Sequence, residues 1–247
     1  MAWIRYFPFD LLYNFKTFNL NTGIITISHN RPSVLRLWCC QIKRLREELE
    51  TYIPAVVVSD EADESICNEY HVFHITQQNN PVTEKFNRAF KYMQSQGINA
   101  VMTLGSDDII STEYVRKTLA ELNNGADYVG TRVFYFYCGQ GLDRGKMVKL
   151  DSPQTKGIGR TVTKAILDQC DWRLWNKPKN WGMDAIATKN IVKYAKKKAI
   201  IEDIIVDVKT RVNLNSFKIW GRRLPQVPPE IFYNILSEEE LLILKTL

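Results

Sequence analysis

Short apolar runs alternate with longer amphipathic stretches through the first half of the chain. The short runs are bounded by turn residues, as buried strands are, and they predict strands at residues 23–27, 55–58, 72–75 and 100–104. In the intervening stretches apolar residues recur at spacings of three and four, which predicts helices at residues 33–49, 66–70, 86–93 and 112–122. Because the connections are short, this alternation predicts an α/β fold with a mostly parallel central sheet flanked by helices.

Polar and glycine residues mark where these helices begin and end. Ser33 is expected to cap the first helix, and Ser111 or Thr112 to cap the fourth, since a hydroxyl can accept a hydrogen bond from a free backbone N–H there. Gly97 is expected to end the third helix, because glycine adopts the left-handed conformation of a helix C-terminus.

The pattern changes after Gly125. Strands are predicted at 127–129, 133–137, 147–150 and 199–206, and helices at 162–167 and 185–194. The segment 208–220 is expected to be extended or irregular, and the tail is expected to form one or two short helices that dock through Leu241, Leu242 and Leu244. We therefore divide the chain into an aromatic lead-in (1–22), a first half (23–125), a smaller second half (126–224) and a helical tail (225–247).

Composition and charge are those of a globular protein. With 247 residues, 45% of them hydrophobic and 24% charged, and a mean hydropathy of −0.25, the chain can bury one sizeable core, which excludes a disordered or low-complexity protein. The 33 basic residues exceed the 27 acidic ones, and the pI is about 9.0. This mild positive balance favours contact with phosphate, in a nucleotide or in a nucleic acid.

The cysteines and the first residues bear on the cellular compartment. The five cysteines form no C-x-x-C pair, so neither a disulfide framework nor a zinc site is indicated, and we expect a reducing compartment such as the cytoplasm, or the host cytoplasm for a viral protein. The aromatic stretch 1–10 is interrupted by Arg5 and Pro8, and it does not read as a signal peptide. No apolar run is long enough to span a membrane.

Two adjacent carboxylates follow the fourth predicted strand, in the stretch 100–110. The carboxyl end of a strand in an α/β sheet opens onto the crevice where ligands bind, and Asp107 and Asp108 lie at that point. Paired carboxylates there suit Mg²⁺ or Mn²⁺. Because neighbours in an extended backbone point to opposite sides, we expect Asp107 to bind the ion directly and Asp108 to support it. The alternative is an acidic pair that stabilises the N-terminus of the next helix.

Three short stretches carry a resemblance to a known family. The strand and turn that end in Ser28-His-Asn-Arg-Pro32, the strand Val56-Val-Val-Ser-Asp60, and Leu104-Gly-Ser-Asp-Asp108 resemble the first strand, the second strand and the Leu-Asp-x-Asp-Asp signature of family 2-type glycosyltransferases. The chain departs from the family at Gly105, where the first acid of the signature stands, and at Phe86, where an arginine often precedes Asn87.

The resemblance implies the GT-A fold, with a nucleotide-sugar half at 23–125 and an acceptor half beyond it. Asp107 matches the last acid of the metal-binding D-x-D pattern, with Asp108 beside it and Mn²⁺ or Mg²⁺ as the ion. The residues implied to contact the donor nucleotide and its phosphates are Ser28, Asn30, Arg31, Asp60, Lys85, Asn87 and Asp108.

The second half supplies the candidates for acceptor chemistry. Asp184 precedes a predicted helix, as the catalytic base of inverting family members does, although an aspartate there can equally be an N-cap. Arg160, Trp175 and Trp181 are expected to contact the acceptor, the tryptophans by stacking on a sugar or a base. A loop tryptophan can instead anchor its loop to the core.

These residues predict a metal-dependent and inverting transfer of a sugar from a nucleoside diphosphate, with a UDP-sugar favoured, to the hydroxyl of a saccharide or a modified DNA base. The first alternative is a sugar-phosphate nucleotidyltransferase. It is disfavoured because Ser28-His-Asn-Arg-Pro32 stands where that class carries a glycine-rich loop. The second alternative is a non-enzymatic nucleic-acid-binding module, which would not need paired acids at the end of a strand.

Overall fold

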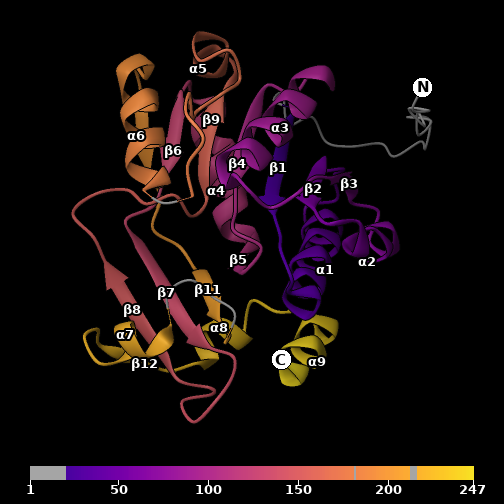
Figure 1. Ribbon diagram of the computed structural model, residues 1–247. Helices are drawn as coiled ribbons and strands as arrows, with labels where there is room; N and C mark the ends of the chain where they lie inside the picture. The colour runs from indigo at the N-terminus through magenta and orange to yellow at the C-terminus, as the bar shows by residue number, and fades with distance from the viewer. Residues whose placement is uncertain (1–20, 181, 212–215) are drawn as a thin grey trace.

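The computed structural model describes residues 21–180, 182–211 and 216–247. Within these ranges the chain forms two β-sheets, and helices cover both faces of the larger one (Figure 1). The predicted lead-in 1–22 falls outside the described residues except for its last two. The predicted α/β class is confirmed.

The larger sheet has seven strands in the order β10-β6-β9-β4-β1-β2-β3. Their bounds are β1 (Thr22–Ile27), β2 (Ala55–Ser59), β3 (Phe73–Thr76), β4 (Ala100–Thr103), β6 (Tyr128–Gly130), β9 (Arg160–Thr163) and β10 (Lys198–Ile200). β3, β2, β1 and β4 pair in parallel, whereas β9 lies antiparallel between β4 and β6. The sheet is therefore mostly parallel, and it takes strands from both sides of Gly125.

Alternating apolar residues explain why both faces of this sheet are covered. On β1, Ile24 is buried in one hydrophobic cluster and its neighbour Ile25 in another, because successive strand residues face opposite sides. The first cluster lies under α1 (Pro32–Glu48), α2 (Glu64–Glu69) and α4 (Thr112–Asn123), and the second under α3 (Val82–Ser95), α5 (Lys164–Gln169) and α6 (Met183–Tyr194). A short 3₁₀ turn, η1 (Glu61–Asp63), leads into α2.

Two of the three predicted helix ends are confirmed. Ser111 caps α4 by accepting a hydrogen bond from the backbone N–H of Tyr114, and Gly97 follows α3 with a φ of 67°. The prediction that Ser33 caps the first helix is wrong, because α1 begins at Pro32 with Arg31 as its N-cap. Proline suits the first helical position, where no N–H is needed.

The smaller sheet has the strand order β12-β8-β7-β11-β5. Its strands are β5 (Asp108–Ile110), β7 (Val133–Cys138), β8 (Met147–Asp151), β11 (Ile205–Lys209) and β12 (Gln226–Val227). β5 follows the acidic motif directly and pairs antiparallel with β11, so that Asp108 lies opposite Asp207. The acidic motif therefore stands where the two sheets meet (Figure 1).

Two predicted elements of the second half are corrected. The helix predicted at 162–167 begins only at Lys164, because Val162 belongs to β9 and pairs with Val101. The strand predicted at 199–206 is divided between β10 and β11, which lie in different sheets. β11 then continues to Lys209, and α7 (Phe217–Gly221) forms within the segment expected to be irregular.

The tail forms two short helices, as predicted. These are α8 (Glu230–Tyr233) and α9 (Glu238–Thr246), and α9 is held against α1 by the buried ion pair of Arg44 with Glu240. Leu244 docks on the body, but Leu242 is 64% exposed, which corrects its predicted role. None of the helices in the described part of the chain has the length and apolar character needed to cross a bilayer.

Candidate active site

The acidic motif forms a tight turn between the two sheets. β4 ends at Thr103, and the backbone N–H of Asp108 bonds the carbonyl of Gly105 at 3.0 Å. The Asp108 carboxylate accepts a hydrogen bond from the N–H of Gly105. Because Asp107 lies in this turn and not in an extended strand, the expectation that the two carboxylates point to opposite sides is wrong.

Gly105 is where the chain departs from the acidic signature of the family, and the turn explains why it is a glycine. A Cβ atom at this position would lie 2.7 Å from Oδ1 of Asp107 and 3.0 Å from Oδ2 of Asp108. Any side chain would therefore push the carboxylates out of their present places. The turn leaves no room for a third acid at position 105.

Asp207 completes a cluster of three carboxylates with Asp107 and Asp108. One carboxylate oxygen from each residue can be chosen so that all lie within 4.8 Å of one another. Asp207 was not among the predicted site residues, because β11 reaches this point only through its pairing with β5 and β7. The local signal is a pair of opposite charges, Asp207 and Lys209, spaced by two residues on an apolar strand, which places both on one face.

Burial and mutual repulsion disfavour the ionised form of Asp108 and Asp207 in this cluster. Burial, and then the charges of Asp107 and Asp207, raise the pKa of Asp108 well above its usual range, although the Gly105 N–H acts in the opposite direction. Burial and the Asp107 charge raise the pKa of Asp207 to about 7. Oδ1 of Asp207 has no hydrogen-bond partner among the described residues. Three oxygen donors with an unsatisfied buried acceptor fit a hard divalent cation.

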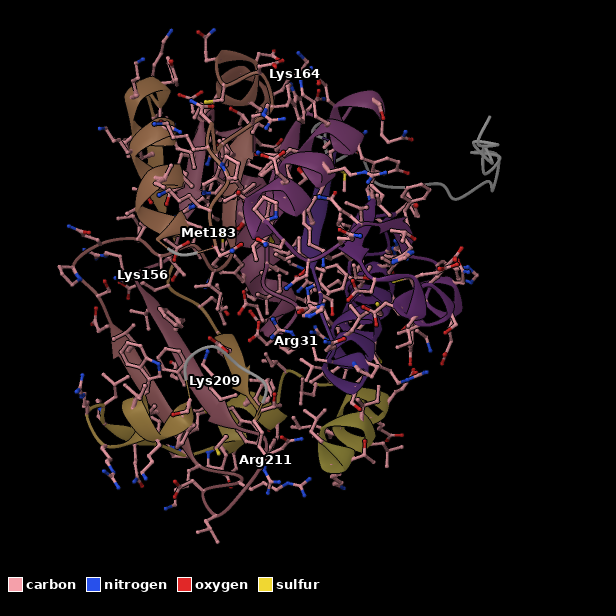
Figure 2. The ribbon with its side chains drawn as sticks, in the orientation of Figure 1. Arg31, Lys156, Lys164, Met183, Lys209 and Arg211 are labelled. Atoms are coloured by element: carbon pink, nitrogen blue, oxygen red, sulfur yellow. The ribbon has the colours of Figure 1, made fainter. Side chains whose placement is uncertain are left out.

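Two basic side chains lie against the cluster. Nη1 of Arg31 is 3.1 Å from Asp107, and Nζ of Lys209 is 2.5 Å from Asp207. Lys209 is only 7% exposed; burial alone would lower its pKa, but the Asp207 and Asp107 charges raise it overall. Figure 2 shows Arg31 and Lys209 near the centre of the molecule, where the two sheets meet.

The turns after β1 and β2 are joined by a short chain of polar contacts. His29 lies 2.6 Å from Asp60 through Nδ1 and 3.0 Å from the amide nitrogen of Asn30 through Nε2. Because an amide nitrogen only donates, Nδ1 of His29 carries the proton that Asp60 accepts. Asn30 adopts a positive φ of 52°, which the turn requires. Ser28 is buried just before this turn.

Lys85 and Asn87, on α3, hold neighbouring loops. Lys85 is fully buried and donates to the carbonyl of Ser28 at 2.6 Å, and burial lowers its pKa. Asn87 donates to the carbonyl of Trp175 at 2.9 Å. Their contact with a donor stays a prediction, and so do the donor contacts of Ser28, Asn30 and Asp60.

Asp184 lies in the first turn of α6 and does not cap it, since Gly182 is the N-cap. Its side chain is 68% exposed and lies 3.9 Å from Nη2 of Arg160. Arg160 pairs with Thr103 at the end of β4, so this contact places Asp184 beside the strand that leads into the acidic turn. A base role for Asp184 stays a prediction.

The predicted acceptor contacts of Arg160 and Trp175 need correction. Arg160 is 2% exposed and donates to the hydroxyl of Thr188 at 2.9 Å, so it supports α6 from within. Trp175 is 3% exposed, packs against the ring of Phe86 and donates through Nε1 to the carbonyl of Met183. Neither side chain offers a face to an acceptor. The third predicted contact, Trp181, lies outside the described residues.

Comparison with known proteins identifies the family of the chain. Residues 23–179 match the sequence model of glycosyl transferase family 2. The chain belongs to glycosyl transferase family 2. Its resemblance to this family and the GT-A type of fold are therefore confirmed.

S. aureus TarS has the same fold at low sequence identity. S. aureus TarS is 14% identical with a TM-score of 0.54, and the match covers 87% of this chain but only 38% of TarS. A cytidylyltransferase from Leptospira borgpetersenii is 14% identical with a TM-score of 0.49, over 93% of this chain and 98% of that one. The chain thus spans well under half the length of TarS. No curated protein is significantly similar to it.

Proposed function

We propose that this family 2 protein is a metal-dependent, inverting glycosyltransferase that moves a sugar from a nucleoside diphosphate, with UDP favoured, to an acceptor hydroxyl. The observation that carries the proposal is the convergence of Asp107, Asp108 and Asp207 at the junction of the two sheets. A cluster of this kind at a strand end of an α/β sheet lies where ligands bind in such folds.

Asp107 and Asp207 are the proposed ligands for Mn²⁺ or Mg²⁺. Asp108 is bonded to the turn backbone and so holds the loop in shape. The ion would supply positive charge to the leaving diphosphate. Arg31 and Lys209 flank the same cluster, and their charges would stabilise the negative charge that develops on the leaving group.

The turns after β1 and β2 form the proposed nucleotide site. Asp60 is held by His29, which is in turn held by Asn30, so the three side chains are ordered before a ligand arrives. Backbone groups of Ser28 and the Asp60 carboxylate can hydrogen-bond the edge of a base. Pre-ordered groups lose less entropy on binding.

Asp184 is the proposed base. Its exposed carboxylate stands on the first turn of α6, beside Arg160, where an acceptor can reach it from solvent. In the transfer step it would take the proton of the acceptor hydroxyl as the new glycosidic bond forms and the bond to the diphosphate breaks. An inverting reaction needs such a base on the side of the sugar opposite the leaving group, where the acceptor hydroxyl attacks.

Donor turnover tests this function. The purified chain is incubated with UDP-sugars and Mn²⁺, and released UDP is measured with and without EDTA. We expect slow hydrolysis that needs the ion, and Asp107→Asn should abolish it. Asp171→Asn, which removes an exposed carboxylate, is the matched control and should keep full turnover.

A second assay separates the alternative chemistry. The same preparation is given nucleoside triphosphates and sugar 1-phosphates, and pyrophosphate is measured. Pyrophosphate release without hydrolysis of UDP-sugars would show a nucleotidyltransferase and contradict the proposal. Turnover that persists at the wild-type rate in Asp107→Asn would contradict the role of the acidic cluster.

A further inference from the structure

The charge of the chain is divided unequally between its two halves. Residues 126–247 carry 21 Lys and Arg against 13 Asp and Glu, a balance of +8, whereas residues 1–125 carry 12 against 14, a balance of −2. The donor nucleotide is the strongly anionic substrate, yet the excess of positive charge lies in the half assigned to the acceptor. This distribution suggests that the acceptor is negatively charged as well.

The exposed basic residues of α7 and its C-terminal end concentrate part of this charge. Lys218, Arg222 and Arg223, the α7 basic surface, line a hollow together with Ser216 and Ile219. All three side chains are exposed, and no carboxylate of the described residues forms an ion pair with them. Many other exposed cations of the chain are paired, such as Lys43, Lys91 and Lys117.

A stack of side chains ties this surface to the acidic cluster. Trp220 of α7 stacks on Phe136 with ring centroids 4.9 Å apart, and Nζ of Lys209 lies 5.2 Å from the centre of the Phe136 ring. Lys209 in turn is paired with Asp207. Trp220 and Phe136 therefore connect the α7 basic surface to Lys209, which flanks the acidic cluster.

The base of α7 is packed closely, so the surface has a fixed position. Phe217 is buried, and a Cβ atom at Gly221 would lie 2.7 Å from its ring. Arginine side chains in fixed positions bind carboxylate and phosphate groups through two parallel hydrogen bonds. Ile219 is exposed between them and can contact the apolar face of a sugar ring.

We propose that the acceptor is an anionic saccharide whose phosphate, sulfate or carboxylate groups bind the α7 basic surface while its hydroxyl reaches Asp184, the proposed base. The proposal rests on the function proposed above and names the substrate class of that site. A nucleic acid fits less well, since three cations fall short of the six to ten phosphate contacts of many DNA-binding proteins. The tryptophans Trp172 and Trp175, which could stack on bases, are buried.

Binding of a defined polyanion tests the proposal. Fluorescent dextran sulfate, neutral dextran of the same length and a single-stranded DNA oligonucleotide are titrated with the full chain, and anisotropy is measured over a range of salt concentrations. The test variant is Lys218→Gln/Arg222→Gln/Arg223→Gln. The matched control, Lys193→Gln/Lys196→Gln/Lys198→Gln, removes the same charge from exposed positions between the last turn of α6 and the first residue of β10.

We expect the wild-type chain to bind dextran sulfate and not dextran. The α7 variant should bind at least about tenfold more weakly. The slope of log K against log salt concentration should become shallower by about two, since each of the lost contacts contributes roughly 0.7 to that slope for a flexible polyanion. The control variant should change the affinity by less than about threefold, because its positions lead into β10 of the larger sheet, whereas α7 packs on β7 of the smaller sheet. Circular dichroism verifies that both variants are folded.

Three results would overturn the proposal: no binding of dextran sulfate, equal weakening by the control variant, or tighter binding of the DNA oligonucleotide than of dextran sulfate. Hydrolysis of UDP-sugars with Mn²⁺ by the wild-type chain is measured in the same preparations. Its absence would contradict the proposed transferase function, whereas the titrations alone decide whether the α7 basic surface binds anionic saccharides.

Discussion

Lys209 and Asp207 form an ion pair of 2.5 Å on β11. This strand pairs with β5, so that Asp207 lies opposite Asp108 of the acidic motif. Both residues face the same side of β11, and the Asp207 carboxylate clusters with those of Asp107 and Asp108. The ammonium group therefore offsets part of the negative charge that three neighbouring carboxylates accumulate. Arg31 does the same for Asp107.

Replacing this lysine should expose the repulsion within the cluster. Lys209→Met is expected to lower the free energy of unfolding by about 3 kcal/mol in the absence of divalent ions, because a buried charge loses its partner. Saturating Mn²⁺ should narrow that deficit, since the ion supplies the missing positive charge. Urea denaturation with and without Mn²⁺ measures both values.

Lys146→Met is the control for this experiment. Lys146 is exposed and pairs with Asp143 at the surface, so its loss should cost less than about 1 kcal/mol under either condition. An equal deficit of Lys209→Met with and without Mn²⁺ would show that the ion and the ammonium do not share a site.

Gly105 should tolerate no side chain without loss of the site. Gly105→Ala is expected to displace the Asp107 and Asp108 carboxylates, because its Cβ would lie within 3.0 Å of both. The affinity for Mn²⁺ should fall at least about tenfold, as it does in other metal sites when the residues that orient the ligands are changed. Isothermal titration of Mn²⁺ measures this. Ser106→Ala, at the next position of the turn, should bind Mn²⁺ like the wild type. Unchanged affinity in Gly105→Ala would mean that the turn adapts.

Asp184 should act on the acceptor and not on the donor. Asp184→Asn is expected to slow sugar transfer by about 10²- to 10⁴-fold, as the loss of a general base does, while the affinity for UDP and the melting temperature stay at wild-type values because the side chain is exposed. Single-turnover kinetics and titration with UDP separate the two effects. Asp151→Asn, exposed in the same half, should transfer normally. Equal losses of UDP binding and transfer would contradict the base role.

The C-terminal helix should depend on one buried charge. Glu240 is fully buried and pairs with Arg44 at 2.7 Å, and it also accepts a hydrogen bond from the backbone of Ser237. Glu240→Gln is expected to cost about 3 kcal/mol, because the buried Arg44 would lose its close counter-charge and keep only the Glu48 carboxylate, 3.9 Å away. Urea denaturation measures the loss.

Glu238→Gln provides the comparison for this helix. It removes an exposed charge from the same first turn, and it should cost less than about 1 kcal/mol through the helix dipole alone. If both variants lose the same stability, the buried pair does not hold α9.

The parallel part of the fold was predictable because its signals are local. Each of the strands β1, β2 and β4 contains a short, mostly apolar run. The amphipathic helices after them carry apolar residues at spacings of three and four. The acidic motif could be found in the same way, since it directly follows such a strand. Val162 shows the limit, because its pairing with Val101 in β9 overrides a helical pattern that the local sequence also allows.

The rest of the candidate site depends on contacts between distant parts of the chain. Asp207 joins Asp107 only because β11 pairs with β5, and no local pattern announces that pairing. Trp175 and Arg160 were predicted to contact the acceptor. Trp175 instead packs beside Phe86, in line with the alternative that a loop tryptophan anchors its loop, and Arg160 lies beneath α6. The turn at Gly105 likewise brings together two carboxylates that an extended backbone would separate.

Titration of UDP in the presence and absence of Mn²⁺ tests the central claim, that the acidic cluster and a divalent ion hold the donor diphosphate. For the wild-type chain we expect UDP to bind in Mn²⁺ and to lose at least about tenfold in affinity in EDTA. Asp107→Asn and Asp207→Asn should bind UDP in Mn²⁺ only as weakly as the wild type does in EDTA. UDP affinity that is the same with Mn²⁺ and with EDTA, or that survives both substitutions, would contradict the account.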